Sequence, residues 1–103
     1  MTERRFEFTW DPDKRARNLR DHKVAFEDAV LVFADPLHRT RQDRIEDGEV
    51  RWQTMGTVGG VTVLLVAHLL DEDEDAVEWV RIISARKATR RERREHEQAQ
   101  SDE

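Results

Sequence analysis

The longest apolar run in the chain, VTVLLVAHLL at positions 61–70, constrains the fold most strongly. It has only about half the ~20 residues that a membrane-spanning helix needs. It is also too continuously apolar for a strand with one face in water. Gly59-Gly60 before it is a two-residue hairpin signal, and the acidic segment 71–76 after it is typical of a loop. The run is therefore predicted to be a central strand of a sheet.

Weaker strand patterns occur on both sides of this run. Near the N-terminus, Phe6, Phe8 and Trp10 alternate with polar residues, which is the period-2 pattern of a strand with one buried face. The other predicted strands are 37–44, a charged candidate for the sheet edge, 50–58 after an Asp47-Gly48 turn, and 77–85.

Two helices are predicted after the first strand. Asp11-Pro12 is a start signal, because an N-cap carboxylate accepts from free backbone donors and proline lacks a donor that the first turn leaves unpaired. This helix is expected to end near His22. The second has apolar residues at helical spacing from Phe26 to Phe33 and stops at Asp35-Pro36. The expected fold class is α+β, with two N-terminal helices packed on a mainly antiparallel sheet and a short C-terminal helix.

The segment RIISARKATRRERRE at 81–95 is predicted to run from an apolar strand directly into an arginine-dense helix. Thr89-x-x-Glu92 is a capping box that starts this helix. Guanidinium groups at the end of a strand are suited to binding a phosphodiester, since each offers a planar fork of donors and keeps its charge near neutral pH. RNA or a polyphosphate is the first partner to consider.

Length and charge limit the class of protein. The 103 residues fit one domain, expected at 1–98 with a frayed acidic tail at 99–103, and Leu, Ile, Val and Phe make up about 23 per cent, enough for a core. The net charge is −5, yet basic residues concentrate at 81–94 and acidic residues at 71–78. A locally basic patch on an acidic chain suits brief, positioned contact with phosphates rather than nonspecific coating of nucleic acid.

Several kinds of site and compartment are disfavoured. The chain has no cysteine, which excludes disulfides and thiolate catalysis and is compatible with a reducing compartment. Residues 1–5 are followed by no apolar signal region, so a soluble, cytoplasmic protein is expected. The four histidines, His22, His38, His68 and His96, lack metal-ligand spacing, so neither a zinc site nor a cofactor is expected.

Three blocks of sequence together resemble the BrnT toxins of bacterial type II toxin–antitoxin pairs. The first, at 6–36, carries Trp-Asp, a Lys, an Asn, a basic-His pair, Phe-Glu-x-Ala and Asp-Pro; the second is Glu49-x-Arg51 with Gly56; the third is the 81–95 segment. The resemblance covers nearly the whole chain to about Glu95. The family usually has Gly at Lys23 and Ser at Ala25, so Lys23 is expected in a left-handed conformation and the second helix lacks its N-cap.

The resemblance implies a RelE-like ribonuclease fold and a metal-independent endoribonuclease that cleaves RNA and inhibits translation. It also implies a cognate antitoxin, BrnA-like with a ribbon-helix-helix DNA-binding part, and a homodimer within the toxin–antitoxin complex.

Metal-free RNA cleavage needs a base for the 2′-hydroxyl, cationic donors for the scissile phosphate and an acid for the leaving 5′-oxygen. Arg51 and Arg81 are expected on adjacent strands, flanking one phosphate. The remaining candidates are Glu49 as a base, Ser84, Arg86 and Lys87 at a strand-to-helix junction, His22 as a proton carrier on a polar helical stripe with Lys14 and Asn18, and Lys14, Arg90, Arg91 and Arg94 as RNA-binding residues.

A structural role competes with each catalytic one. The arginines also suit surface ion pairs or a link between helix and sheet, and Asn18 and His22 suit backbone contacts at the junction of the two helices. His68 is expected to be a hydrogen-bonded core residue. Tryptophans in predicted strands are expected in the core rather than as base-stacking platforms; they are Trp10, Trp52 and Trp79.

Two other functions stay open at this stage. One is a non-catalytic protein-binding module whose Arg-rich C-terminal helix docks on an acidic partner. The other is a small nucleic-acid-binding regulator, which the acidic net charge disfavours.

Overall fold

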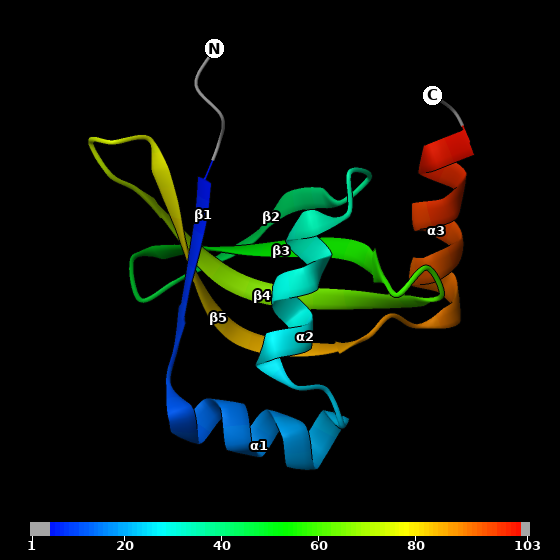
Figure 1. Cartoon of the computed structure of the whole chain (residues 1–103), viewed down its shortest axis with the longest axis horizontal. Coiled ribbons are helices and arrows are strands. Elements are labelled where there is room, and N and C mark those ends of the chain that lie inside the picture. Colours follow the sequence, from blue (N-terminus) through cyan, green and yellow to red (C-terminus); the bar gives the residue numbers. More distant parts are fainter. Residues whose placement is uncertain (1–4, 102–103) are drawn as a thin grey trace.

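The computed structural model describes residues 5–101, which form one five-stranded mixed sheet with three α-helices around it (Figure 1). The elements in chain order are β1 (Arg5–Trp10), α1 (Pro12–His22), α2 (Phe26–Val30), a 3₁₀ segment η1 (Leu31–Ala34), β2 (Arg39–Glu46), β3 (Glu49–Val58), β4 (Thr62–Glu72), β5 (Val77–Lys87) and α3 (Arg90–Ser101).

The strand order is β1-β5-β4-β3-β2, so the apolar run at 61–70 lies in the middle of the sheet, as predicted. β2 to β5 form an antiparallel meander, and β2 is an edge strand. β1 pairs in parallel with β5, from Arg5 opposite Val77 to Trp10 opposite Ile82. Alternation within β1 predicts a strand but says nothing about its partner, so this pairing was not predicted.

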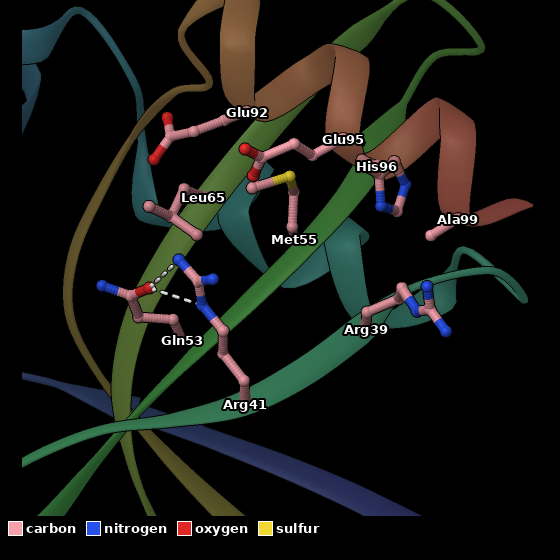
Figure 2. Close-up of a pocket in the computed structure, with 9 residues that line it drawn as sticks. All are labelled: Arg39, Arg41, Gln53, Met55, Leu65, Glu92, Glu95, His96 and Ala99. Atoms are coloured by element: carbon pink, nitrogen blue, oxygen red, sulfur yellow. Dashed lines mark hydrogen bonds between the residues drawn. The ribbon is translucent and has the colours of Figure 1, made fainter.

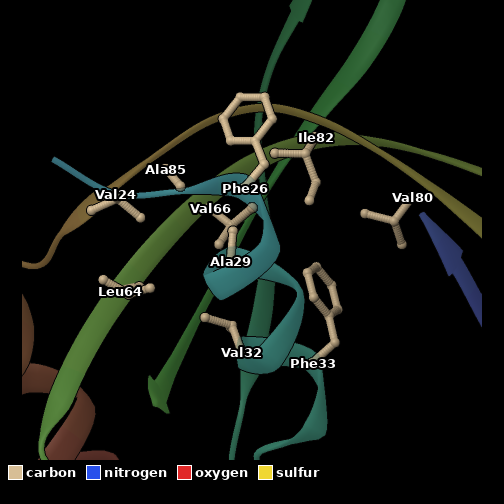
Figure 3. Close-up of a cluster of buried hydrophobic side chains, with 10 residues drawn as sticks. All are labelled: Val24, Phe26, Ala29, Val32, Phe33, Leu64, Val66, Val80, Ile82 and Ala85. Carbon is tan, nitrogen blue, oxygen red and sulfur yellow. The ribbon is translucent and has the colours of Figure 1, made fainter. Parts of the chain in front are cut away.

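The core lies between one face of the sheet and the segment formed by α2 and η1 (Figure 3). Phe26, Ala29 and Val32 from this segment are fully buried against Val66 of β4 and Val80 of β5. Phe33 packs on the rings of Phe6 and Phe8, at centroid distances of 5.5 and 5.2 Å. The apolar side chains at helical spacing in this segment therefore pack against the inward-facing apolar side chains of the strands and form one core.

Gly56 of β3 lies in close contact with η1. A Cβ atom at this position would lie 2.9 Å from both Cγ1 and the carbonyl oxygen of Val32. Because the backbone oxygen cannot move aside cheaply, glycine is required for this contact between layers.

α1 begins and ends where the sequence predicts, whereas the second helix changes to a 3₁₀ segment at Leu31 before it reaches Asp35. Asp11 caps α1, its carboxylate accepting from the backbone N–H of Asp13 at 2.8 Å. Lys23 ends the helix in the left-handed region with φ of 60°, and Ala25 begins α2 without a side-chain cap.

α3 stands at the far end of the sheet from β1 (Figure 1). It continues to Ser101, three residues past the expected boundary at Gln98. Residues 102 and 103 of the expected tail lie outside the described part of the chain. Within residues 5–101, no helix is long and apolar enough to cross a membrane.

Candidate active site

The face of the sheet opposite α2 carries charged side chains beside apolar ones such as Leu65 and Leu69. In β5, Ile82 points into the core opposite His68, so its neighbour Arg81, opposite Leu69, points to the other face. A groove of about 520 Å³ opens there, which we call the Trp79 groove. The residues that line it are Thr9, Glu49, Val50, Trp52, Leu69, Leu70, Asp71, Trp79 and Arg81. It brings together Glu49 and Arg81, two of the residues predicted from the sequence.

Arg51 lies on the same face as Arg81 but not on an adjacent strand. β4 separates β3 from β5, so two strand spacings, about 10 Å, lie between their backbones. The prediction of adjacent strands was wrong because the order of strands in a sheet is not encoded in the period of each one. The Nε of Arg51 is buried and lies 3.1 Å from Oε2 of Glu46, without hydrogen-bond geometry, so this pair holds the side chain beside β2.

Trp79 is not a core residue, contrary to the expectation from its place in a strand. It is 41 per cent exposed, and its indole N–H donates to Oδ2 of Asp73 at 3.0 Å. This bond, with one from the backbone N–H of Val77, holds the pKa of Asp73 below its usual range. Trp10, by contrast, packs edge-on against Phe26 at 5.9 Å, as expected.

A second, shallower groove of about 250 Å³ lies between α1 and β5, and we call it the α1 groove. It brings together Lys14, His22 and Ser84 from the predicted site, and its other lining residues are Arg17, Asn18, Asp21 and Ile83. Ser84 is in mid-strand, six residues before α3, and not at the strand-to-helix junction. β5 has a register shift opposite Ala67 and His68, which the apolar pattern of 77–85 did not reveal.

Asn18 is a structural residue at the floor of this groove. Its Nδ2 donates to the carbonyl oxygens of Val24 and Ala85 at 2.9 and 2.8 Å, and its Oδ1 accepts from the N–H of Ala85 at 3.0 Å. The side chain therefore joins α1, the helix junction and β5 through backbone groups. His22, one turn later, is exposed at the end of α1.

Arg86 is committed to an ion pair and not free at the end of the strand. Its guanidinium donates to both carboxylate oxygens of Glu92, at 2.7 and 2.9 Å. Glu92 also accepts from the N–H of Thr89, whose hydroxyl accepts from the N–H of Glu92, so the predicted capping box is present. The hydrogen bonds from Arg86 hold the pKa of Glu92 at about 2. Arg86 thus fastens the start of α3 to the sheet, while Lys87 beside it is exposed.

A third groove, of about 140 Å³, lies where α3 meets the edge of the sheet (Figure 2). Arg39 and Arg41 of β2 stand on one side, and Glu92, Glu95 and His96 of α3 on the other. The guanidinium of Arg41 donates to Oε1 of Gln53 at 3.1 and 3.2 Å. The predicted RNA-binding residues Arg90, Arg91 and Arg94 are exposed on α3, and Arg91 pairs with Glu95 at 3.3 Å.

His68 is a hydrogen-bonded core residue, as expected. Its Nε2 lies 2.7 Å from Oγ1 of Thr54, which lies 2.7 Å from Oγ1 of Thr40, and its Nδ1 lies 3.3 Å from the carbonyl oxygen of Leu69. Burial lowers the pKa of His68 to about 4, so the ring is neutral at physiological pH. Among the described residues, no group of three or more His, Asp or Glu side chains is placed to hold a metal ion.

Two residues of the Trp79 groove were missed by the sequence interpretation. Trp79 and Asp71 stand directly opposite each other on β5 and β4. The signal was present in the alternation, because Val80 and Ile82 point inward and so place Trp79 on the outer face together with Arg81.

Comparison with known proteins agrees with this architecture. The family model described as "Ribonuclease toxin, BrnT, of type II toxin-antitoxin system" matches residues 10–92. The crystal structure of the ribonuclease toxin BrnT from Brucella abortus is similar in fold, with a TM-score of 0.55 and 20% sequence identity. That match covers 86% of this chain and 100% of the Brucella chain. No curated protein sequence matches the chain.

Proposed function

Because the chain belongs to the BrnT family of ribonuclease toxins of type II toxin–antitoxin systems, we propose that it is an endoribonuclease that cleaves RNA in the Trp79 groove. The observation that carries this proposal is the convergence of Glu49 and Arg81 on one open groove, with Arg51 next to it on the same face. A carboxylate and guanidinium cations around an open groove are the components that transphosphorylation of RNA requires.

In the proposed reaction, Glu49 takes the proton of the 2′-hydroxyl. The 2′-oxygen then attacks the adjacent phosphorus, a 2′,3′-cyclic phosphate forms, and the bond from phosphorus to the 5′-oxygen breaks. The leaving 5′-oxygen takes a proton from water, which the open groove admits. Arg81, which lines the groove, donates to the phosphate oxygens as their negative charge grows. Arg51 donates to them from β3 when its guanidinium exchanges Glu46 for the phosphate.

We propose that this cleavage needs no metal ion, since the two guanidinium groups supply the cationic stabilisation. Arg86 has a structural role in this scheme, because its guanidinium is already paired with Glu92. Lys87 and Ser84 contribute to substrate binding rather than to proton transfer.

The RNA is proposed to continue from the Trp79 groove along two basic surfaces. Lys14 and His22 in the α1 groove, with Ser84 of β5, form one of them. Arg90, Arg91 and Arg94 on α3 form the other, because their exposed guanidinium groups attract phosphates without reading sequence.

Membership in the family supports three further proposals. The fold is of the RelE-like type, cleavage inhibits translation in the cytoplasm, and a BrnA-like antitoxin with a ribbon-helix-helix part neutralises the toxin in a complex that holds a toxin homodimer. If no RNA is cleaved, the Arg-rich α3 instead serves a non-catalytic module that docks on an acidic partner.

Purified protein tests the proposal directly. Wild-type protein is expected to cut single-stranded RNA in excess EDTA and to leave the same sequence intact when the scissile ribose is replaced by deoxyribose. Arg81→Ala is expected to slow cleavage by about a hundredfold, as for loss of one donor to a developing oxyanion.

Arg20→Ala is the matched control, since Arg20 is an exposed arginine of α1 that lines neither the Trp79 groove nor the α1 groove. Cleavage of DNA at the same rate, activity abolished by EDTA, or equal activity of Arg81→Ala and wild type would each contradict the proposed mechanism.

A further inference from the structure

We propose that Trp79 is a stacking platform for one unpaired base of the RNA, and that Asp71 beside it selects bases that present N–H donors. The inference deepens the proposed ribonuclease function, on which it rests, by naming the residues that choose where the RNA is cut.

Trp79 is exposed in the groove. A large indole ring that is 41 per cent exposed in a small protein leaves apolar surface in water that could be buried. The ring lines a groove of about 520 Å³, within the range of small-molecule and nucleotide pockets. Stacking on tryptophan tolerates every base because every base has an aromatic face.

The indole ring of Trp79 is already held in place before any ligand binds. Its N–H donates to Oδ2 of Asp73, whose Oδ1 in turn accepts from the backbone N–H groups of Asp75 and Val77 at 2.9 and 3.1 Å. A platform fixed in this way loses little freedom when a ligand binds, so more of the stacking energy appears as affinity.

The indole ring of Trp79 also lies beside Arg81, which is proposed to bind the scissile phosphate. Trp79 and Arg81 are two residues apart on the same face of β5, about 7 Å along the strand. A base on the indole is therefore close enough for its own phosphate group to reach Arg81, and Thr9 of β1 stands opposite Arg81 on the neighbouring strand.

The base edge is read by Asp71. Asp71 pairs directly with Trp79 across β4 and β5, and its Oδ1 accepts from the N–H of Glu72 at 3.0 Å. An ionised carboxylate only accepts hydrogen bonds and has further acceptor sites. Guanine offers adjacent N–H donors at N1 and N2 on one edge, whereas uracil offers one donor between two carbonyl acceptors. The geometry therefore favours guanine over uracil on the platform.

The test is binding of 2′-O-methyl hexanucleotides, which are not cleaved because they lack the nucleophile. Fluorescence anisotropy would measure Kd for an all-uridine hexamer and for one with a single central guanosine. For the guanosine hexamer, Trp79→Ala is expected to weaken binding about tenfold, within the range for loss of one stacked base, while Trp79→Phe stays within about threefold of wild type. Asp71→Asn is expected to remove the preference for guanosine while leaving binding of the uridine hexamer unchanged or tighter.

Leu37→Ala is the matched control, because Leu37 is a comparably exposed apolar residue away from the groove, and it should bind like wild type. Unchanged affinity in Trp79→Ala would overturn the platform, and an unchanged preference in folded Asp71→Asn would overturn the readout. A parallel assay of wild-type cleavage separates the two proposals. Cleavage with binding that does not depend on Trp79 rejects only this inference, whereas binding that depends on Trp79 without cleavage rejects the nuclease and leaves the platform standing.

Discussion

The same strands supply a buried apolar surface on one face of the sheet and an exposed surface on the other. On the face covered by α2 and η1, Val66, Val80 and Ile82 are almost fully buried and packed against Phe26. On the other face, the neighbours of these residues include Arg81 and Trp79, which are exposed. Because successive side chains of a strand point to opposite faces, one sequence segment supplies both surfaces.

The comparison teaches that stability and function are nearly independent in this chain. Substitutions on the covered face should act through unfolding, since they remove buried apolar contacts. Substitutions on the open face should change RNA binding or cleavage and leave stability nearly unchanged, since exposed charges contribute little to folding. Variants of the open face and of the covered face should therefore differ in which quantity changes, the cleavage rate or the free energy of unfolding.

The largest expected effect is on the open face. Glu49→Gln keeps the size of the side chain but cannot take a proton, so the rate of RNA cleavage should fall about a thousandfold, within the range for general-base catalysis. The midpoint of urea unfolding should stay unchanged because Glu49 is exposed. Single-turnover cleavage measures the effect, with Glu74→Gln in the acidic loop as the control. A rate within threefold of wild type would remove Glu49 from the mechanism.

On the covered face, Phe26→Ala should lower the free energy of unfolding by about 3 kcal/mol. This is toward the low end of the range for such substitutions because Trp10, which packs edge-on against the ring, can relax into the space. Urea denaturation followed by circular dichroism gives the value. Leu31→Ala, an exposed residue of the same helical segment, should cost far less. A similar cost for both variants would show that the face beneath α2 is not the core.

Acid should lower the free energy of unfolding, because protonation of the unfolded chain at His68 competes with burial of its neutral ring on the covered face. Its folded-state pKa of about 4 lies below the ordinary 6.5, so the unfolded chain takes up the proton first. The contribution of the neutral ring is therefore complete above pH 6.5 and is lost as the pH falls toward 4. Between pH 7 and 4.5 the loss should be about 2 kcal/mol. His68→Asn, which keeps a polar partner for Thr54, should lack this part of the pH dependence in urea titrations. Identical pH profiles for variant and wild type would refute the assignment.

The smallest effect should be at the start of α3. Glu92→Ala removes half of the capping box and the partner of Arg86, and it should cost about 1 kcal/mol. Glu92 has a depressed pKa, so its contribution is present above the ordinary 4.5 and is lost as the pH falls toward 2. Glu95→Ala, whose pair with Arg91 is exposed, should cost about 0.3 kcal/mol or less. Equal costs at neutral pH would show that the Arg86 pair adds nothing to folding.

The sequence predicts the elements of this fold well because each has a local cause. Asp11 caps α1, the 61–70 run becomes the central strand, and Thr89 with Glu92 starts α3. The parallel pairing of β1 with β5 could not be predicted, since it depends on contacts between residues about 70 positions apart and neither strand records its neighbour.

The candidate site was predicted in part. Glu49 and Arg81 meet in one groove, while Lys14, His22 and Ser84 meet in another. Arg86 was a catalytic candidate with an ion pair as the alternative, and the sequence could not decide between them because it does not show which cation pairs with the carboxylate six residues later. Trp79 was predicted as buried because propensity places tryptophan in a core, although the alternation in β5 already placed it outside.

The parallel pairing of β1 with β5 also determines when the chain can fold during its synthesis. β1 is synthesised before the other described strands, yet its strand neighbour within residues 5–101 is β5, the last of them. The side-chain amide of Asn18 likewise cannot form its hydrogen bonds to the backbone of Ala85 until that residue has been synthesised. A nascent chain that stops before β5 therefore has no pairing partner for β1. It also lacks the β5 residues that line the α1 groove and the Trp79 groove. Translation must therefore pass residue 87 before the sheet can close around β1.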